Sequence, residues 1–285
     1  MIHPLLQRIL VHPRSKVPLQ RVESNRLVFD NDQTCECTNG IPVLVIPDEK
    51  SHHYLHHYEQ DAVKFDYYEE RDPATEHDEY RLRQTILREV ADTAQCVLDV
   101  GCGRAWVADA LCSPALTVCS LDAALPNPLA ASQRHSSEHH CAVVADALAL
   151  PFADNSFDCV VSSEVIEHVV DPAAFVHELL RVLKPGGRCI VSTPYNEKRQ
   201  FVLCIHCNTP TPLHAHLHSF TERTLTSLAP NVPLHYHIFS NKALLLLRTY
   251  VLLQFLPYPL WRMVDRVANA LINKPAHIVC VWTKC

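Results

Sequence analysis

Short apolar runs alternate with amphipathic stretches across residues 95–194, and this alternation is the clearest structural signal in the chain. The apolar runs are rich in Val, Leu, Ile and Cys, as in strands that are buried on both faces. The stretches between them, such as "AWVADALC" and "DPAAFVHELLRVLK", have helical spacing. Strand–helix alternation of this kind predicts an α/β fold, a doubly wound sheet that is mostly parallel and covered by helices. The expected strands are "QCVLDV", "LTVCSLD", "CAVVAD", "FDCVVSSEV", "GRCIVSTP" and, near the end of the chain, "HIVCVW".

The patterns outside this core divide the chain into three expected parts. Residues 1–50 have the short strands and turn signals of a small β-module, residues 51–94 are expected to form a helical linker or cap, and residues 95–285 form the main domain. Residues 241–274 are an apolar helical insertion before the last strand. Polar residues interrupt it, so it falls short of the ~20 apolar residues that span a bilayer. A core-facing helix pair, a dimer surface and a helix lying in a membrane interface remain open for it.

Composition and charge narrow the class of protein. The chain has 285 residues, of which 48% are hydrophobic and 20% are charged, as in globular proteins. Residues 1–180 carry a formal charge of −15 and residues 181–285 one of +9. Such asymmetry indicates either an anionic partner for the C-terminal part or attraction between the two parts. Thirteen cysteines and a short apolar N-terminal run, interrupted by Arg8, predict a reduced, cytoplasmic compartment.

Glycines and acidic residues at strand ends mark the first candidate site. Only 5 glycines occur, and Gly101 and Gly103 directly follow the strand that ends at Asp99. In a doubly wound sheet this strand end binds nucleotide-like ligands, and glycine lets the backbone approach them. Asp122 and Asp146 end the next two strands. Three strand-terminal acids suit a ligand with sugar and amine groups better than one with phosphates.

Residues 95–194 resemble a class I S-adenosylmethionine-dependent methyltransferase. The resemblance rests on "LDVGCG", "SLD", "VVADALALPFADNSFDCVVSSEVIEHVVDP" and "ELLRVLKPGGRCIVSTP", which follow the order and spacing of that family. It implies a Rossmann-like sheet of seven strands whose last strand is antiparallel, and S-adenosylmethionine as the cofactor. One residue departs from the family pattern: Ala105 replaces the third glycine of the loop, and its methyl group is expected to crowd the cofactor slightly.

The same resemblance assigns the cofactor-binding residues. Asp99 and the loop of Gly101 and Gly103 would hold the methionine part of the cofactor. Asp122 would bind the ribose, and Asp146 with the backbone of Ala147 the adenine.

A second candidate site follows the strand "FDCVVSSEV". If Glu164, Glu167 and His168 form a helical turn, they share one face. Glu-x-x-Glu-His resembles the metal site of small-RNA 2′-O-methyltransferases and ubiquinone-pathway O-methyltransferases. A later histidine completes the former, and here His218 or His216 stands at that point. We expect Glu164, Glu167, His168 and His218 to line the acceptor pocket as catalytic residues, either with a divalent ion (Mg, Mn or Zn) or as metal-free loop residues.

A rival zinc site lies in "LCIHCNTPTPLHAHLHSF". Two thiolates and two imidazoles suit tetrahedral zinc, and Cys204 and Cys207 with His214 and His216 offer this set. The alternative is a metal-free loop that lines the acceptor pocket. The two metal hypotheses compete for the same histidines.

The N-terminal module also has a resemblance, carried mainly by "NGIPVL". It is similar to the small zinc-ribbon-like activator proteins of tRNA and rRNA methyltransferases. Of that family's cysteine pairs only Cys35 and Cys37 remain, and His12 stands where cysteine is common. We therefore expect a metal-free β-module that packs on the catalytic domain. The following run, "SHHYLHHY", is expected to be an exposed polar helix.

These features together predict a methyltransferase that acts on an oxygen of a small or lipid-linked acceptor. RNA methylation is the alternative. The activator resemblance favours it, whereas the net charge of −6 and the lack of a dense basic run oppose it. A non-catalytic scaffold that binds the cofactor is the third interpretation. Peripheral membrane contact stays open, and the sequence does not give the oligomeric state.

Overall fold

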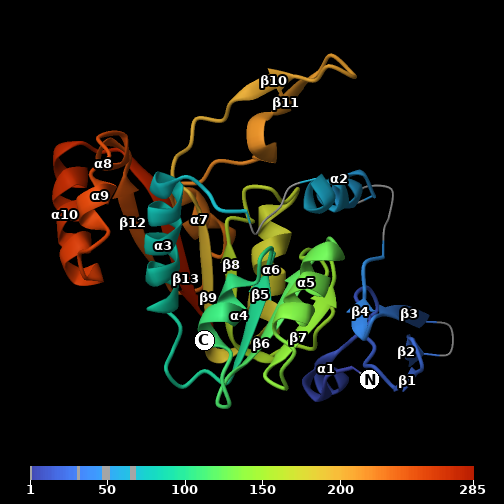
Figure 1. The fold of residues 1–285 in the computed structure, drawn as a ribbon. Coiled ribbons are helices and arrows are strands. Elements are labelled where there is room, and N and C mark those ends of the chain that lie inside the picture. Colours follow the sequence, from blue (N-terminus) through green and yellow to red (C-terminus); the bar gives the residue numbers. More distant parts are fainter. Residues whose placement is uncertain (1, 31–32, 47–51, 65–68) are drawn as a thin grey trace.

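Strands with apolar residues on both faces build the centre of the molecule (Figure 1). The structure is a computed structural model that describes residues 2–30, 33–46, 52–64 and 69–285. Every residue of β5 (Cys96–Val100) and of β7 (His140–Val144) is buried. Strands of this kind need cover on both faces, and the helices supply it.

One sheet of eleven strands runs through the described part of the chain, in the order β1-β2-β3-β4-β7-β6-β5-β8-β9-β13-β12. From β7 to β9 neighbouring strands pair in parallel. β13 is antiparallel to β9, and β12 is antiparallel to β13. The expected mostly parallel sheet with an antiparallel last strand is thus confirmed. The bounds of the other strands of this part are β6 (Thr117–Asp122), β8 (Phe157–Ser163), β9 (Leu183–Pro194), β12 (Leu234–Asn241) and β13 (Pro275–Thr283).

The expected count of seven strands is wrong, because N-terminal strands extend the same sheet. They form an antiparallel meander whose last strand pairs in parallel with β7 through Val43 and Val144. Leu27 and Phe29 are fully buried in the same hydrophobic cluster as Leu98 of β5. The N-terminal β-structure therefore shares its core with the main sheet. Its elements are α1 (Pro4–Ile9), β1 (Arg21–Glu23), β2 (Arg26–Asp30), β3 (Gln33–Thr38) and β4 (Ile41–Val43).

Helices cover the sheet, and the sequence pattern did not predict one of them, α5. α5 begins with "PNP", and the two prolines conceal it, although proline is tolerated in the first turn of a helix. A short hairpin, β10 with β11, projects from the body of the molecule (Figure 1). The bounds are α2 (His52–Lys64), α3 (Pro73–Leu87), α4 (Trp106–Leu111), α5 (Pro126–Arg134), α6 (Pro172–Val182), α7 (Glu222–Leu228), β10 (Phe201–Leu203), β11 (Pro210–Pro212) and the 3-10 helix η1 (Leu213–Ala215).

Three helices of the apolar insertion lie at the β12 edge of the sheet, beside α3 (Figure 1). The buried Arg81 of α3 anchors them, because its guanidinium donates to the carbonyl oxygens of Leu253 (2.7 Å) and Leu256 (2.9 Å). The same guanidinium lies 5.0 Å from the ring of Trp261. Among the described residues, no helix has both the length and the hydropathy of a membrane-spanning segment. The bounds are α8 (Lys242–Leu246), α9 (Tyr250–Leu253) and α10 (Tyr258–Leu271).

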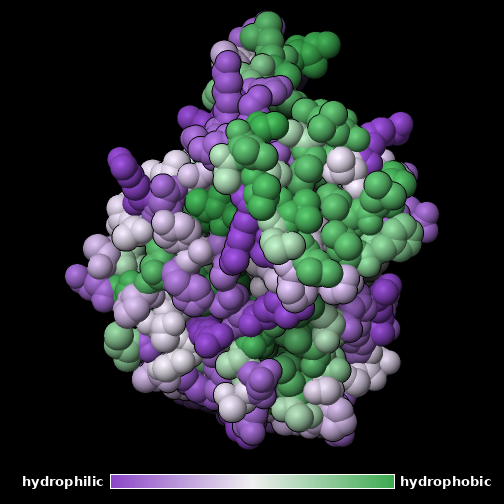
Figure 2. Space-filling view, turned by 90° about the vertical axis from the view of Figure 1, so that its left-hand side faces the viewer, coloured by the Kyte–Doolittle hydropathy of each residue, from purple (hydrophilic) through white to green (hydrophobic). Residues whose placement is uncertain are grey.

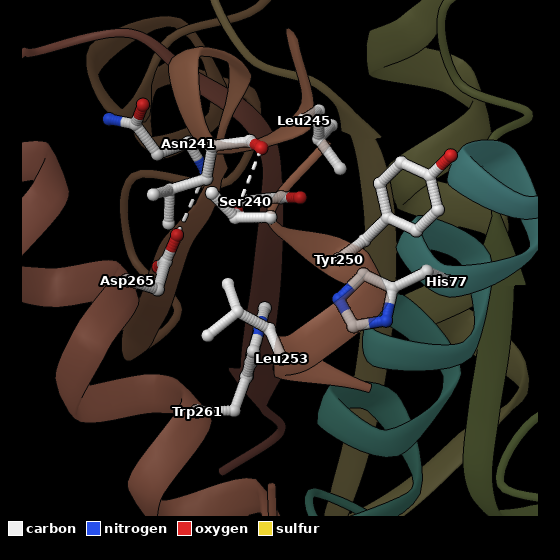
Figure 3. A pocket seen from close by; sticks show the side chains of 10 residues that line it. His77, Ser240, Asn241, Leu245, Tyr250, Leu253, Trp261 and Asp265 are labelled. Atoms are coloured by element: carbon white, nitrogen blue, oxygen red, sulfur yellow. Dashed lines mark hydrogen bonds between the residues drawn. The ribbon is translucent and has the colours of Figure 1, made fainter. Parts of the chain in front are cut away.

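A small cavity of about 10 Å³ lies where this insertion meets α3 and β12 (Figure 3). That is about the space that one water molecule needs. His77 and Tyr250 line one side, and Asn241 and Asp265 line the other. The insertion is thus packed closely onto the domain along this boundary.

Candidate functional site

The carboxyl ends of β5, β6 and β7 lie side by side and bring the predicted acids to one edge of the sheet. Asp99 is the second-to-last residue of β5. Asp122 is the last residue of β6, and Asp146 lies two residues after the end of β7. The backbone N–H of Gly103 donates to Oδ2 of Asp122 (3.2 Å), and that of Ala124 donates to Oδ1 (3.0 Å). The loop after β5 is therefore tied to the acid at the end of β6.

The loop after β5 depends on left-handed backbone. Gly101 has φ +73° and Gly103 has φ +46°. A Cβ atom at Gly101 would collide with Cγ2 of Val165, so the loop can lie against the segment after β8 only because of this glycine. Ala105 adopts φ +54°, which is unfavourable for a residue with a Cβ atom. Its methyl group is fully buried in the core cluster with Val107. This position does not indicate that the methyl group crowds the cofactor, as the sequence had suggested.

Two neighbouring carboxyl groups with raised pKa values characterise this edge. Burial, and then the charge of Asp122, raise the pKa of Asp99 to about 8. Oδ2 of Asp99 is buried and accepts no hydrogen bond from the described residues. Burial also raises the pKa of Asp122, and backbone hydrogen bonds from Ala124 and Gly103 oppose that rise. An acid held in this state favours a cationic group as its neighbour.

α2, which belongs to the segment expected as a helical linker or cap, covers this edge of the sheet. Burial, the neighbouring Tyr58, and then Asp146 and Asp122 raise the pKa of Tyr54. The hydroxyl of Tyr58 lies 3.5 Å from the carbonyl oxygen of His168, and its ring meets that of Tyr54 at 4.9 Å. The helix was expected to be merely polar and exposed. The available signal was the spacing of Tyr54, Leu55 and Tyr58, which places apolar side chains on one face.

The segment after β8 does not form one helical turn that includes Glu164, the condition under which the three residues would share a face. Glu164 adopts φ +56°, so it leaves the face that Glu167 and His168 share. Residues of β9 hold both carboxyl groups: Ser192 donates to Oε1 of Glu164 (2.9 Å), and Thr193 donates to Oε2 of Glu167 (3.0 Å). The pairing of β8 with β9 therefore positions both acids.

Glu167 is the most buried acid of this segment. It is 1% exposed, and its Oε1 atom has no hydrogen-bond partner among the described residues. Burial, and then the charge of Glu164, raise its pKa well above the usual range of a glutamic acid. A buried carboxyl with one free oxygen is poised to accept a cation or a proton donor.

His168 and His216 complete a group of three with Glu167. Nε2 of His168 lies 4.0 Å from Oε1 of Glu167, and the rings of His168 and His216 are 4.9 Å apart. The potential ligand atoms of the three residues all lie within 4.8 Å of one another. Burial, and then His216, lower the pKa of His168 to about 4, so its imidazole is neutral at pH 7. His216 is also held by Glu197, whose Oε2 is 2.5 Å from Nδ1.

His218, which the sequence favoured over His216, faces elsewhere. The backbone N–H groups of Leu217 and His218 both bond to the carbonyl oxygen of Glu167, which directs the side chain of His218 away from the group. His218 lines a hollow of about 450 Å³ together with Arg199 and Phe220. Its buried Nε2 atom has no hydrogen-bond partner among the described residues.

The rival zinc set is not brought together. Cys204, Cys207 and His214 lie on or beside the projecting hairpin, whereas His216 belongs to the group with Glu167. In the described ranges, a second group of potential metal ligands does occur, and it was not predicted. It consists of Glu89, His235 and His237, with both imidazoles hydrogen-bonded to the carboxylate. Alternate residues of β12 point to one side, which explains the pair of histidines.

A partly buried histidine that the sequence did not single out lies next to Glu164. His277 of β13 bonds to Oδ2 of Asp78 through Nε2 (2.9 Å), and its Nδ1 lies 3.6 Å from Oε2 of Glu164. Burial alone would lower its pKa, but Glu164 and Asp78 raise it to about 10. His277 is therefore a partly buried cation between two carboxylates. The three residues are far apart in sequence, so no local motif could reveal them.

Comparison with known proteins identifies the class of this domain. Residues 98–191 match the family model described as "Methyltransferase domain". The fold agrees: an S-adenosylmethionine-dependent methyltransferase from Mesorhizobium loti superimposes with a TM-score of 0.52 at 16% identity, over 72% of this chain and 99% of that one. Residues 98–191 thus match a methyltransferase domain, and the fold is that of the solved methyltransferase structure.

Two curated relatives are similar in sequence over part of their length. Tocopherol O-methyltransferase of Arabidopsis thaliana is 44% identical over 104 residues, which are 34% of this chain and 29% of the relative. Ubiquinone biosynthesis O-methyltransferase of Pseudomonas entomophila is 33% identical over 135 residues, which are 45% of this chain and 57% of the relative. The chain thus spans less than two thirds of either relative.

Proposed function

We propose that this chain transfers a methyl group from S-adenosylmethionine to an oxygen atom of a small-molecule acceptor. The observation that carries the proposal is the edge of the sheet where three strand-end acids surround a glycine loop, inside a domain that matches a methyltransferase model. Both relatives reported above are named as O-methyltransferases. The names of these relatives refer to tocopherol and to ubiquinone biosynthesis, which supports a phenolic acceptor that carries an apolar tail.

The residues at this edge fit the cofactor. Its ammonium group suits the free Oδ2 atom of Asp99, whose raised pKa indicates a site built for a cation. We assign the hydrogen bonds of the ribose hydroxyls to Asp122, and the adenine to Asp146 with the backbone of Ala147. The sulfonium of the cofactor supplies the methyl group. Tyr54 and Tyr58 of α2 would exclude water on the side of the site that this helix covers, which favours in-line transfer.

Activation of the acceptor is assigned to the residues after β8. A hydroxyl must lose its proton as it attacks the methyl group, and in the absence of a metal the neutral imidazole of His168 can take that proton. Glu167, His168 and His216 also offer one carboxylate and two imidazoles, a donor set that suits Mn, Fe or Zn better than Mg. We propose that these three residues hold a divalent ion, which would lower the pKa of a bound hydroxyl. Glu164, next to the cationic His277, is close enough for its charge to act on Glu167.

A transfer assay tests this function. Protein incubated with methyl-labelled S-adenosylmethionine and a panel of catechols, prenylated phenols, tRNA and rRNA is expected to label the phenols. Glu167→Gln with His168→Ala should abolish the labelling while leaving cofactor binding intact. Labelling of RNA alone would replace the proposal with RNA methylation. Cofactor binding with no labelled product in any class would favour the scaffold interpretation.

Proton release is expected when the cofactor binds. At pH 7 a carboxyl with a pKa of about 8 is mostly protonated, and a bound ammonium group lowers that pKa, so most of one proton leaves Asp99. Calorimetry in two buffers with different ionisation enthalpies measures it. Asp99→Asn should bind more weakly and release little or no proton. Wild-type protein that binds the cofactor without any net proton release would contradict the role of Asp99.

A further inference from the structure

α10 carries its apolar side chains on the wrong face for a helix that meets water. Leu260, Met263, Val267 and Leu271 follow one another at spacings of three and four, which places them in one stripe. They are between 49% and 81% exposed. A surface helix of a globular protein normally turns such a stripe toward the core.

The opposite face of α10, which packs on the protein, combines the buried Trp261 with polar side chains. Asp265 is 1% exposed and accepts hydrogen bonds from the backbone N–H of Asn241 (2.8 Å) and from Arg262 (2.6 Å). Arg262 also donates to the carbonyl oxygen of Ile238, and Asn269 bonds to Asp265. Figure 3 shows Asp265 and Asn241 facing each other across this boundary. The orientation of α10 is therefore fixed by specific hydrogen bonds, with its apolar stripe outward.

The stripe of α10 is part of a larger apolar area. Eighteen large hydrophobic side chains are exposed in the described part of the chain, and ten of them lie within residues 246–272. Figure 2 shows the side of the molecule that carries α8–α10, where hydrophobic surface forms a broad area beside hydrophilic side chains. Clustering of this kind marks an interaction surface rather than scattered exposure. The members outside the stripe are Leu246, Leu247, Val251, Leu252, Phe255 and Ile272.

Exposed basic side chains lie on the same insertion as this apolar area, and no exposed acidic side chain of the insertion balances their charge. Four exposed basic residues belong to it, and none forms an ion pair with a described residue: Lys242, Arg248, Arg266 and Lys274. The single acidic residue among residues 241–274 is Asp265, which is buried against Arg262. The outer face of the insertion is thus both apolar and cationic.

We propose that α8, α9 and α10 bind the surface of a membrane that contains anionic lipids, with α10 lying flat in the interface. An interfacial helix combines an apolar face with basic residues, which are attracted to anionic headgroups. Here the protein covers the polar face of α10, so only the apolar and basic parts remain for the lipid. This inference does not depend on the proposed methyl transfer.

A second copy of the chain is the competing occupant, and the charges disfavour it. A twofold interface places the same patch on both sides. The four basic residues of each copy would then face the same four residues, with no carboxylate of the insertion to compensate them. Like charges that meet in an interface oppose association.

Vesicle flotation tests the proposal. The full chain is mixed with vesicles of phosphatidylcholine alone or of phosphatidylcholine with phosphatidylglycerol, at low salt and at about 1 M salt, where the Debye length is about 3 Å. We expect flotation with the anionic vesicles at low salt and a large loss at high salt. Recovery of the protein in the unbound fraction with anionic vesicles at low salt would overturn the proposal.

Paired variants locate the contact. Val267→Glu with Leu271→Glu should lower the bound fraction roughly tenfold or more, because binding strength scales with buried apolar area. The matched control, Val63→Glu with Val170→Glu, adds the same charge at exposed positions on other elements and should float like the wild type. Equal losses in both pairs, at unchanged thermal unfolding, would contradict a contact through α10.

Two further measurements separate the alternatives. Light scattering reports the oligomeric state: a dimer that Val267→Glu with Leu271→Glu dissociates, combined with no flotation, would assign the face to a second copy. Flotation is measured without S-adenosylmethionine. Failure of methyl transfer therefore leaves the membrane result standing, and failure of flotation leaves the transfer result standing.

Discussion

Asp122→Ala is expected to weaken S-adenosylmethionine binding by about 10- to 100-fold. Hydrogen bonds to a charged group contribute about 1.5–3 kcal/mol, and about 1.4 kcal/mol corresponds to a tenfold change in affinity. Asp122 also accepts from the N–H groups of Gly103 and Ala124, so its loss frees the glycine loop as well. Isothermal titration calorimetry measures the change directly.

Two further variants interpret that result. Asp92→Ala removes an exposed aspartate and should leave the dissociation constant unchanged. Asp122→Asn keeps an oxygen acceptor for the loop, so it should bind more tightly than Asp122→Ala and more weakly than the wild type. If Asp122→Ala binds the cofactor as well as Asp92→Ala does, the ribose is held elsewhere.

The sequence predicted the central fold because local signals encode it. Apolar runs on both sides of Gly101 and Gly103 require buried parallel strands, and the acids at 99, 122 and 146 then fall at one edge of the sheet. The N-terminal extension of that sheet was missed for a physical reason. It depends on the pairing of Val43 with Val144, and no local pattern specifies which strand an edge will accept.

The sequence predicted the site after β8 only for those residues that are adjacent in the chain. Glu164, Glu167 and His168 are adjacent in sequence and do lie together, but the left-handed backbone of Glu164 separates its side chain from the other two. The choice between His216 and His218 is made by two backbone hydrogen bonds to Glu167, which spacing cannot reveal. Asp78 and His277 enter from α3 and β13, so only the assembled fold brings them to Glu164.

Among the three interpretations left open for the insertion, a core-facing helix pair agrees least with the structure. Trp261 and Asp265 do face the core, but the leucines that suggested burial are largely on the outside. The spacing of apolar residues in α10 does indicate which residues form its apolar face. What the sequence could not give is that Asn241 and Arg262 hold the polar face against the domain.

Glu167→Gln is expected to reduce the affinity for a divalent ion by roughly 100-fold or more. The change removes one of three proposed ligands, and loss of even a hydrogen-bond partner of a ligand costs about 10- to 100-fold. Glutamine has the same shape as glutamate and can still accept the hydrogen bond from Thr193. The fold should therefore survive the change. Protein loaded with Mn or Zn, desalted and analysed for metal content gives the comparison.

The group of Glu89, His235 and His237 supplies the matched control, because it offers the same donor types in an unrelated place. Glu89→Gln should leave the metal content unchanged, and so should Cys204→Ser, which removes one thiol of the rival zinc set. Arg188, 3.9 Å from the carboxylate of Glu89, opposes a cation there, whereas no Arg or Lys among the described residues forms an ion pair with Glu167. If Glu167→Gln retains the metal and Glu89→Gln or Cys204→Ser loses it, the ion does not bind at Glu167 on the acceptor side. His168 would then have to take the acceptor proton without a metal.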